Sequence, residues 1–239
     1  KPIARWSIIF KEKSQRSGRM LSPLKAYEIW FRCYGPQGWW PADSTEEICV
    51  GAILTQNTSW RNVEEAIAAL KKRGWLSLKA LCEIREEELC EAIRPCGFYR
   101  QKARYLKEFA ISIERGFKTL DALFEKPLKE ARNWLLNRTG IGEETADSIL
   151  CYAGRHPILV IDNYTLRIGG RLGWWPGEWD KRQYAAAQRL LMDNLPKDAT
   201  ILGEWHALAV AHAKAHCKKK PSCGSCPLLI KGQTHPPSD

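Results

Sequence analysis

The 239-residue sequence contains no uninterrupted apolar run of about 18 residues, the length that a membrane-spanning helix needs. It also lacks a signal-peptide pattern, so we expect a cytoplasmic protein with no membrane partner. Its nine cysteines are an odd number without a secreted framework, which argues against complete disulfide pairing and favours a reducing compartment. The sequence therefore excludes a membrane protein and a disulfide-stabilised secreted domain.

Charge is the next informative feature of the composition. The chain carries 37 Lys and Arg against 27 Asp and Glu, a formal net charge of +10. Such a balance suits a protein that captures phosphates electrostatically. Residues 1–19 are rich in basic side chains and show little periodicity, so we expect an arm that is disordered or foreign to the natural protein. No long heptad pattern stands out, and we expect a monomer.

A short glycine turn lies between two helical patterns in the middle of the chain. The apolar positions that repeat at helical spacing are Leu128, Ala131 and Leu135 before the turn, and Ala146, Ile149, Leu150 and Ala153 after it. Gly140 and Gly142 permit a tight turn and a close approach of the backbone to a partner. Free N–H groups at the start of the second helix form an anion site that suits a phosphate. An ordinary helix–turn–helix corner is the alternative.

One aspartate, Asp162, directly follows the apolar run 159–161. A carboxylate in such a place is partly desolvated, so its charge acts strongly on a nearby cation. The transition state of N-glycosidic bond cleavage is cationic at the sugar, as in glycosidases. Asp162 is also a good N-cap for a helix that begins near Asn163, and the two roles are compatible.

The hairpin, its glycines and Asp162 match in order and spacing the signature of the helix-hairpin-helix DNA glycosylases, so residues 23–226 resemble the endonuclease III superfamily. The resemblance implies an all-α fold of two lobes with the lesion pocket between them, and double-stranded DNA containing a damaged base as the partner. Residues 43–156 would form one lobe, and residues 20–42 with 157–239 the other. It also implies that Gly140, Ile141 and Gly142 bind a DNA phosphate and that Asp162 is the essential carboxylate.

Residues 44–70 read as two helices around a polar turn. Ser44 and Glu47 predict a capping box for the first helix, and Asn57 or Ser59 can cap the second. A solvated loop is the plain interpretation of this turn. In the family, however, a glutamine at this place enters the duplex and fills the gap left by the extruded nucleotide. Gln56 matches that glutamine, and Asn57 is a further DNA-contact candidate.

Three tryptophans near this turn, Trp39, Trp40 and Trp60, suit the recognition of an extruded base, because aromatic faces stack on bases. Pro41 directly follows the first two. Their arrangement looks closest to the bacterial 3-methyladenine DNA glycosylase III branch, where the two tryptophans and the proline line the pocket. A cationic 3-methyladenine gains about 0.5–2 kcal/mol per cation–π contact. The alternative is that one of the adjacent tryptophans belongs to the core.

Three cysteines near the C-terminus, Cys217, Cys223 and Cys226, have the close spacing of metal ligands. Endonuclease III relatives carry a [4Fe–4S] cluster here on four cysteines, which makes this cluster the expected cofactor. The position of the family's fourth cysteine is Gly232 in this chain, so the fourth ligand must come from elsewhere. His235, Cys33 and a non-protein ligand are candidates, and zinc on three thiolates and a histidine is the alternative.

The lysine that bifunctional relatives use as an amine nucleophile is absent from this chain. Its position is occupied by Glu144, which cannot form a Schiff base. We therefore expect a monofunctional enzyme in which Asp162 stabilises the sugar cation and orients a water. Lys102 and Arg167 are candidate phosphate contacts, with solvated surface charge as the alternative.

These observations predict a base-excision-repair DNA glycosylase, associated with the nucleoid, that acts on alkylated purines such as 3-methyladenine. The same fold could instead serve a monofunctional mismatch or uracil glycosylase, or an oxidised-pyrimidine glycosylase. A non-catalytic DNA-binding protein is the alternative of another class, because the hairpin also occurs in purely structural proteins. The role of Asp162 discriminates between the enzyme and the binding protein.

Overall fold

The computed structural model describes residues 21–229, and all statements on structure refer to them. The expected N-terminal arm and the candidate ligand His235 lie outside this range. Within it, the secondary structure consists of helices joined by turns and extended segments, with no strand, as an all-α fold requires. No helix of the described residues is long and apolar enough to cross a membrane.

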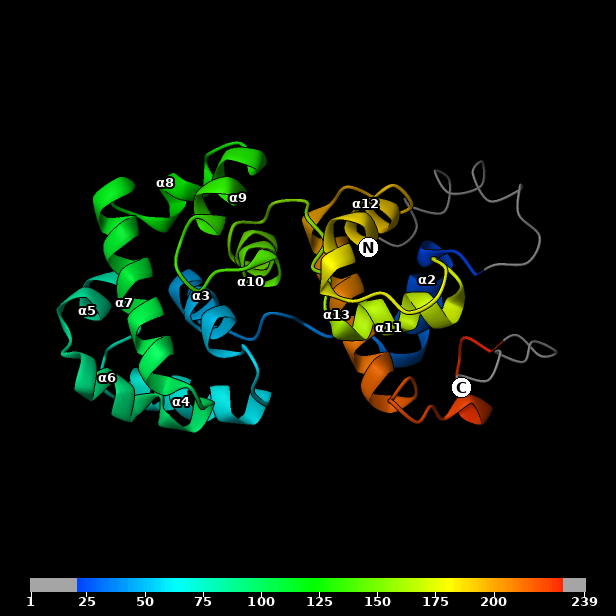
Figure 1. Cartoon of the computed structure of the whole chain (residues 1–239), viewed down its shortest axis with the longest axis horizontal. Helices are drawn as coiled ribbons and strands as arrows, with labels where there is room; N and C mark the ends of the chain where they lie inside the picture. Colours follow the sequence, from blue (N-terminus) through cyan, green and yellow to red (C-terminus); the bar gives the residue numbers. More distant parts are fainter. Residues whose placement is uncertain (1–20, 230–239) are drawn as a thin grey trace.

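The helices form two groups (Figure 1). The hairpin half contains α3 (Thr45–Leu54), α4 (Trp60–Lys72), α5 (Leu78–Glu83), α6 (Glu86–Ala92), η1 (Arg94–Cys96), α7 (Tyr99–Gly116), α8 (Leu120–Phe124), α9 (Leu128–Leu136), α10 (Glu143–Ser148) and η2 (Ile149–Ala153). The terminal half contains α2 (Pro23–Tyr34), α11 (Asn163–Leu172), η3 (Lys181–Gln183), α12 (Tyr184–Met192), α13 (Ala199–Ala215) and η4 (Cys223–Ser225).

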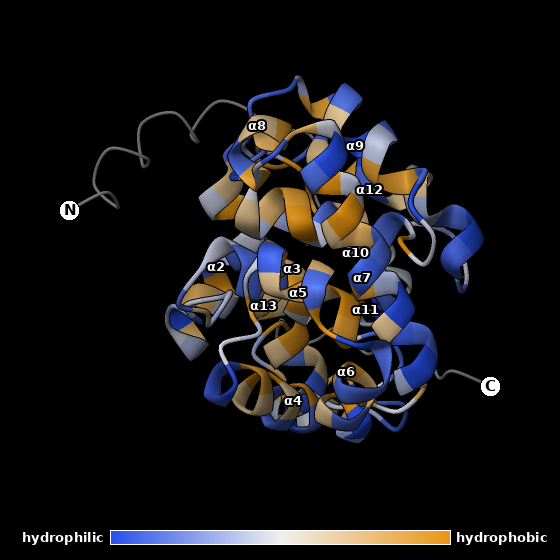
Figure 2. Cartoon of the chain, turned by 90° about the vertical axis from the view of Figure 1, so that its left-hand side faces the viewer, coloured by the Kyte–Doolittle hydropathy of each residue, from blue (hydrophilic) through white to orange (hydrophobic). Residues whose placement is uncertain are grey.

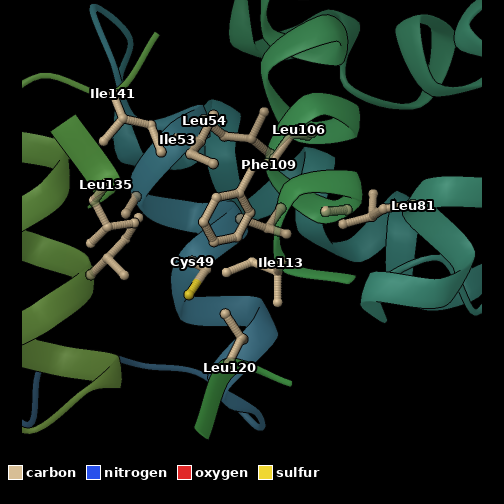
Figure 3. Packing of buried hydrophobic residues seen from close by; sticks show 14 of the residues in the cluster. Cys49, Ile53, Leu54, Leu81, Leu106, Phe109, Ile113, Leu120, Leu135 and Ile141 are labelled. Atoms are coloured by element: carbon tan, nitrogen blue, oxygen red, sulfur yellow. The ribbon is translucent and has the colours of Figure 1, made fainter. Parts of the chain in front are cut away.

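The core of the hairpin half forms around α3 and α7. Helix α7 is amphipathic, and its apolar face buries Leu106, Phe109 and Ile113 against α3 (Figure 3). Helix α3 contributes Ile53 and Leu54, which are fully buried. Apolar residues lie mainly on the inner faces of the helices, and polar residues mainly on the outer faces (Figure 2). Burial of the apolar faces therefore holds this half together.

The terminal half joins segments that are far apart in the sequence. Trp30 of α2 packs edge-on against Trp205 of α13, with ring centroids 5.5 Å apart. The Trp205 indole N–H donates to the Pro23 carbonyl oxygen at 3.0 Å, which satisfies the one polar atom of a fully buried side chain. These contacts attach α2 to the C-terminal helices. The lobe boundaries expected from the sequence stay a proposal, which this division of the core supports.

The segment that leads to Asp162 runs between the two cores. Ile158 and Val160 belong to the core of the hairpin half, whereas Leu159 and Ile161 belong to that of the terminal half. Side chains that alternate between two sides are typical of extended backbone. Because both sides are buried here, all four residues are apolar. The extended segment therefore places Asp162 at the boundary between the two halves.

The N-caps of two helices agree with the sequence expectations, and one of these helix starts differs in a detail. Ser59 caps α4 by accepting from the Asn62 N–H, and Ser44 caps α3 by accepting from the Glu47 N–H. The Glu47 carboxylate, however, accepts from the Asp43 N–H and pairs with Lys71 instead of closing a capping box on Ser44. The expected reciprocal box is therefore wrong in its second half, because the lysine of α4 and the Asp43 N–H engage that carboxylate.

Candidate active site

Asp162 is the N-cap of α11, and its two oxygens have different environments. Oδ1 accepts a hydrogen bond from the Thr165 N–H at 2.7 Å, which fixes the side chain. Oδ2 lies 3.5 Å from Nε2 of His206, which is long for a hydrogen bond. The residue is only 8% exposed. One oxygen is thus used for capping, and the other remains available for chemistry.

Opposing effects act on the pKa of Asp162. Burial alone would raise it, but His206 and the Thr165 N–H stabilise the carboxylate, and the net effect lowers the pKa below its usual value. Asp162 is therefore ionised at neutral pH despite its burial. A fixed carboxylate in a poorly solvated place is what a developing sugar cation requires.

His206 was not identified from the sequence, although its Nε2 lies 3.5 Å from Asp162 Oδ2. It lies on α13 and is 5% exposed. Its Nδ1 is 2.7 Å from the Tyr152 hydroxyl, which also donates to the Gly203 carbonyl oxygen at 3.0 Å. Tyr152 thereby orients the imidazole so that Nε2 faces Asp162. A histidine in an apolar helix gives only a weak sequence signal, because the contact joins residues 44 positions apart.

Glu144 lies in the first turn of α10, at the position where lyase relatives carry a lysine. Burial and then the charge of Asp162 raise the pKa of its carboxyl. Its nearest cation is Lys181 of η3, with Nζ 3.7 Å from Oε2, and both side chains are partly exposed. The charge of Glu144 is thus coupled to that of Asp162, although the two residues come from different halves of the molecule.

The aromatic residues form a series of ring contacts that ends at His206. The ring of Trp39 packs edge-on against His206, with centroids 5.6 Å apart. The ring of Trp40 packs edge-on against both Trp60 and Tyr152, at 5.3 and 5.4 Å. A chain of aromatic contacts therefore runs from Trp60 to the partner of Asp162. Both adjacent tryptophans take part in these contacts, and both are half-buried.

A cavity of about 250 Å³ opens beside the tryptophans. Its walls include Trp40, Pro41 and Trp60, which the sequence predicted together, but neither Trp39 nor Asp162. Trp40 therefore borders the cavity, whereas Asp162 is not among the residues that line it.

Gly51 of α3, which sequence reasoning missed, lets Trp40 lie on that helix. A Cβ atom at Gly51 would lie 3.1 Å from Nε1 of the Trp40 indole. This distance is tighter than ordinary van der Waals contact, so any larger residue would push the ring away. The glycine inside a helix is therefore explained by the close approach of the indole.

The two glycines of the hairpin are required for different reasons. Gly140 has φ +78°, and a Cβ atom there would lie 2.2 Å from the Tyr105 ring. Ile141, 5% exposed, anchors the turn in the core. Gly142 has ordinary extended backbone with φ −90°, and a Cβ atom there would meet nothing within 4 Å. The fold thus needs Gly140, whereas the space in front of Gly142 is open to a partner.

The polar turn after α3 lies against the hairpin. The Gln56 amide donates to the Gly140 carbonyl oxygen at 2.8 Å and contacts the Thr145 hydroxyl at 3.1 Å. Asn57 next to it adopts the left-handed region, with φ +52°. Entry of Gln56 into a duplex would require the release of both hydrogen bonds. The role expected for Gln56 therefore stays a proposal.

Phe98, which sequence reasoning missed, lines a small hollow together with Gln56 and Asn57. It is 69% exposed and has φ +47°, an uncommon conformation for a bulky side chain. An exposed aromatic ring on a strained backbone is costly to keep and points to a functional surface. The Gly97-Phe98-Tyr99 sequence before a helix could have drawn attention to it.

The two cations predicted to contact phosphates, Lys102 and Arg167, lie in different environments. Lys102 is 2% exposed, and its Nζ donates to the carbonyl oxygens of Leu54 and Cys96 at 2.9 and 2.8 Å. The phosphate contact expected for Lys102 is therefore wrong, because its ammonium group ties the end of α3 to η1. Arg167 stays half-exposed, stacks on the Tyr164 ring and donates to the Cys217 carbonyl oxygen at 2.8 Å.

The cysteine loop does not form a preassembled metal site in the described residues. Cys226 Sγ lies 3.7 Å from Nε2 of His212, while Cys217 Sγ lies 3.3 Å from the Arg171 guanidinium. No three His, Cys, Asp or Glu side chains of residues 21–229 gather as metal ligands do. The donor types suit a metal, but their arrangement does not, and Cys33 lies exposed on α2.

Comparisons with known proteins place the chain in a family. The model of the HhH-GPD superfamily of base excision DNA repair proteins matches residues 50–197. A protein of Methanocaldococcus jannaschii assigned as a DNA repair glycosylase is 43% identical over 206 residues, which cover 85% of this chain and 92% of that protein. The thymine-DNA glycosylase of Aeropyrum pernix is 28% identical, with coverage of 88% and 93%.

Solved structures show the same architecture. The crystal structure of the H. pylori 3-methyladenine DNA glycosylase bound to 1,N6-ethenoadenine superposes with a TM-score of 0.71 at 27% identity, over 81% of this chain and 98% of that one. An endonuclease III–DNA intermediate has the same fold, with a TM-score of 0.73 at 22% identity over 87% and 94%. The chain thus belongs to the HhH-GPD superfamily of base excision DNA repair proteins and is a DNA glycosylase of that family.

Proposed function

We propose that this glycosylase is monofunctional and removes alkylated purines, with 3-methyladenine as the model substrate. The observation that carries the proposal is the pairing of an ionised, buried Asp162 with a carboxyl, Glu144, at the place of the lyase lysine. A carboxylate stabilises the sugar cation and orients a water, whereas no amine at this position can attack the sugar. The product would be an intact strand with an abasic site.

The aromatic side chains support an alkylated, cationic base as substrate. Trp40 and Trp60 line the cavity, and Trp39 packs against His206, the partner of Asp162. Each cation–π contact with such a ring contributes about 0.5–2 kcal/mol. The glycosidic bond of a cationic base is already weak, so the enzyme needs to add little. The H. pylori enzyme of similar fold is named for 3-methyladenine.

We propose that the duplex binds across the hairpin and the Gln56 turn. Gly140, Ile141 and Gly142 would hold a backbone phosphate, and the open space at Gly142 allows the close approach. Gln56 would leave its hydrogen bonds to the hairpin and fill the vacated position in the stack. The exposed Phe98 ring in the same hollow would wedge between neighbouring bases. Asn57 and Arg167 remain candidate contacts.

In the catalytic step, Asp162 performs its work with the oxygen that does not cap α11. Oδ2, which lies 3.5 Å from Nε2 of His206, would stabilise the positive charge of the reacting sugar as the base departs. The Thr165 N–H keeps the carboxylate fixed, so little reorganisation accompanies the reaction. His206, which Tyr152 orients, lies beside Oδ2 and limits the rotation of the carboxylate. Water then attacks the sugar and completes the hydrolysis.

The experiment analyses both products of the reaction. Purified protein is incubated with duplex DNA that carries methylated purines, released bases are identified by mass spectrometry, and strands are examined before and after alkali. Free 3-methyladenine with breaks only after alkali supports the proposal. Breaks without alkali contradict the monofunctional assignment.

A mismatch glycosylase is the second candidate, favoured by the 28% identity to the Aeropyrum pernix thymine-DNA glycosylase over most of both chains. Release of thymine or uracil from mispaired duplexes, without release of alkylated purines, would select this candidate. Release of oxidised pyrimidines would select the third alternative within the fold. These substrates are therefore assayed in parallel.

We also propose that the C-terminal cysteines bind a [4Fe–4S] cluster in a monomeric protein, with zinc as the alternative. The three thiols and the imidazole of His212, 3.7 Å from Cys226, supply suitable donors for either. Binding would require the loop to rearrange, because the donors do not converge. Elemental analysis of anaerobically purified protein tests it. Iron with matching sulfide supports the cluster, and zinc supports the alternative. A protein that contains neither iron nor zinc contradicts both proposals.

A further inference from the structure

A buried carboxylate outside the active site connects the hairpin to Asp162. Asp147 lies on α10, the helix that follows the hairpin, and is fully buried. Arg132 of α9 binds both of its oxygens, with Nε 2.7 Å from Oδ1 and Nη2 3.1 Å from Oδ2. Such a bidentate pair holds the two helices of the hairpin in a fixed relation.

The same carboxylate also binds the other half of the molecule. Oδ2 of Asp147 accepts from the Tyr184 hydroxyl at 2.8 Å and from the Gln188 amide at 2.7 Å, both on α12. Helix α12 belongs to the terminal half, so this bond set crosses the boundary between the halves. A buried carboxylate without hydrogen-bonding partners would be costly. Each of the contacts described here supplies such a partner.

The two side chains of α12 also hold the backbone that leads to Asp162. The Tyr184 hydroxyl accepts from the Ile161 N–H at 3.3 Å, and the Gln188 amide donates to the Leu159 carbonyl oxygen at 2.7 Å. Each group therefore serves Asp147 and the extended segment at once. A continuous path of hydrogen bonds runs from the hairpin helices to the residue before Asp162.

We propose that Asp147 is a positioning residue that sets the placement of Asp162 relative to the DNA phosphate held by the hairpin. The proposal rests on the proposed function of the hairpin and Asp162. The hairpin fixes the DNA at a phosphate, and Asp162 must contact the sugar of the damaged nucleotide. The spacing between the hairpin and Asp162 therefore affects the reaction. A displacement of about 1 Å at a reacting group costs on the order of 10²-fold in rate. The Asp147 hydrogen bonds keep that spacing constant.

The test uses Tyr184→Phe, which removes one hydroxyl and leaves the ring packing in place, alongside Asp147→Asn. Tyr27→Phe is the matched control, because it makes the same change on α2, outside the helices that carry Asp147 and its partners. The readouts are single-turnover base release, the Kd for duplex DNA with an uncleavable abasic analogue, and the melting temperature. Asp147→Asn leaves the Arg132 guanidinium without its charged partner, and the variant can therefore lose stability. The conclusion depends on Tyr184→Phe for this reason.

We expect Tyr184→Phe to slow base release about tenfold or more, with a Kd and melting temperature near those of wild type. Tyr27→Phe should match wild type in all three. A rate within twofold of wild type would overturn the proposal. A slower rate accompanied by proportional losses in affinity and stability would overturn it as well, since that is the result of a structural role alone.

Hydrogen exchange supplies a readout that does not depend on catalysis. Binding of undamaged duplex should slow exchange at the hairpin amides, residues 140–146, in every variant. In wild type it should also slow exchange at residues 159–165, and Tyr184→Phe should lose this second protection. Unchanged protection of residues 159–165 in Tyr184→Phe would refute the coupling. If wild type binds DNA but releases no base, the proposed function fails while this measurement still decides the coupling.

Discussion

At the scale of single residues, the two oxygens of Asp162 divide its tasks. Oδ1 caps α11 and Oδ2 faces His206, so the requirements of the fold and of the chemistry do not compete. The neighbouring Glu144 has the opposite character, because burial and the charge of Asp162 raise its pKa. Two carboxyls with pKa values moved apart are typical of sites that divide acid and base roles.

The raised pKa of Glu144 predicts a pH-dependent effect on stability. A carboxyl whose folded pKa is raised binds a proton more tightly in the folded state. It therefore destabilises the fold increasingly as the pH rises from its ordinary pKa of about 4.3 through the folded value. We expect the melting temperature of Glu144→Gln relative to wild type to increase between about pH 4 and pH 7. Glu87→Gln on α6 is the control. The prediction would be contradicted if the melting-temperature difference from wild type did not change with pH for either variant.

Lys102 provides a test that separates folding from DNA binding. Lys102→Met keeps the apolar stem but leaves the carbonyl oxygens of Leu54 and Cys96 without their donor. We expect a loss of about 2–4 kcal/mol in the free energy of unfolding, measured by urea denaturation. The dependence of DNA affinity on salt should match wild type, because a buried ammonium group releases no counterion. If the slope of log affinity against log salt concentration fell by about one in Lys102→Met, Lys102 would contact a phosphate after all.

At the scale of elements, the hairpin combines a rigid turn with an open surface. Tyr105 of α7 packs against Gly140, and Ile141 anchors the turn, while Gly142 faces open space. The adjoining helix α10 continues into the π-helix η2, where the sequence periodicity predicted uninterrupted α-helix. The local pattern therefore located the element but did not predict its π-helical continuation.

The two hairpin glycines should respond differently to substitution. Gly140→Ala forces a Cβ atom into Tyr105 and a side chain into the left-handed region, so we expect a stability loss of about 1–3 kcal/mol. Gly142→Ala should melt near the wild-type temperature and bind duplex DNA several-fold more weakly. Gly116→Ala at the end of α7 serves as the control, because only Trp134, 4.0 Å away, would meet its Cβ atom. Equal DNA affinity of Gly142→Ala and wild type would contradict the phosphate role.

At the scale of the whole molecule, the sequence predicts most features that depend on neighbouring residues and few of the contacts between distant segments. The caps at Ser59 and Asp162 and the hairpin glycines could be predicted, because each depends on neighbours within a few residues. His206, the Asp147 hydrogen bonds and the burial of Lys102 could not, because their partners lie in distant segments. Gly51 likewise becomes meaningful only when Trp40 lies on α3. The family resemblance predicted the all-helical fold, and its cysteine pattern did not reveal how the loop packs.

The most direct measurement compares Asp162→Asn with wild type in single-turnover release of 3-methyladenine from duplex DNA. Asparagine preserves the cap on Thr165 and removes the charge, so the melting temperature should stay close to wild type. Asp193→Asn, an exposed change in the same half, is the control. We expect Asp162→Asn to slow release by at least about 10²-fold, with the control unchanged and strands intact until alkali. Release by Asp162→Asn at the wild-type rate would contradict the account.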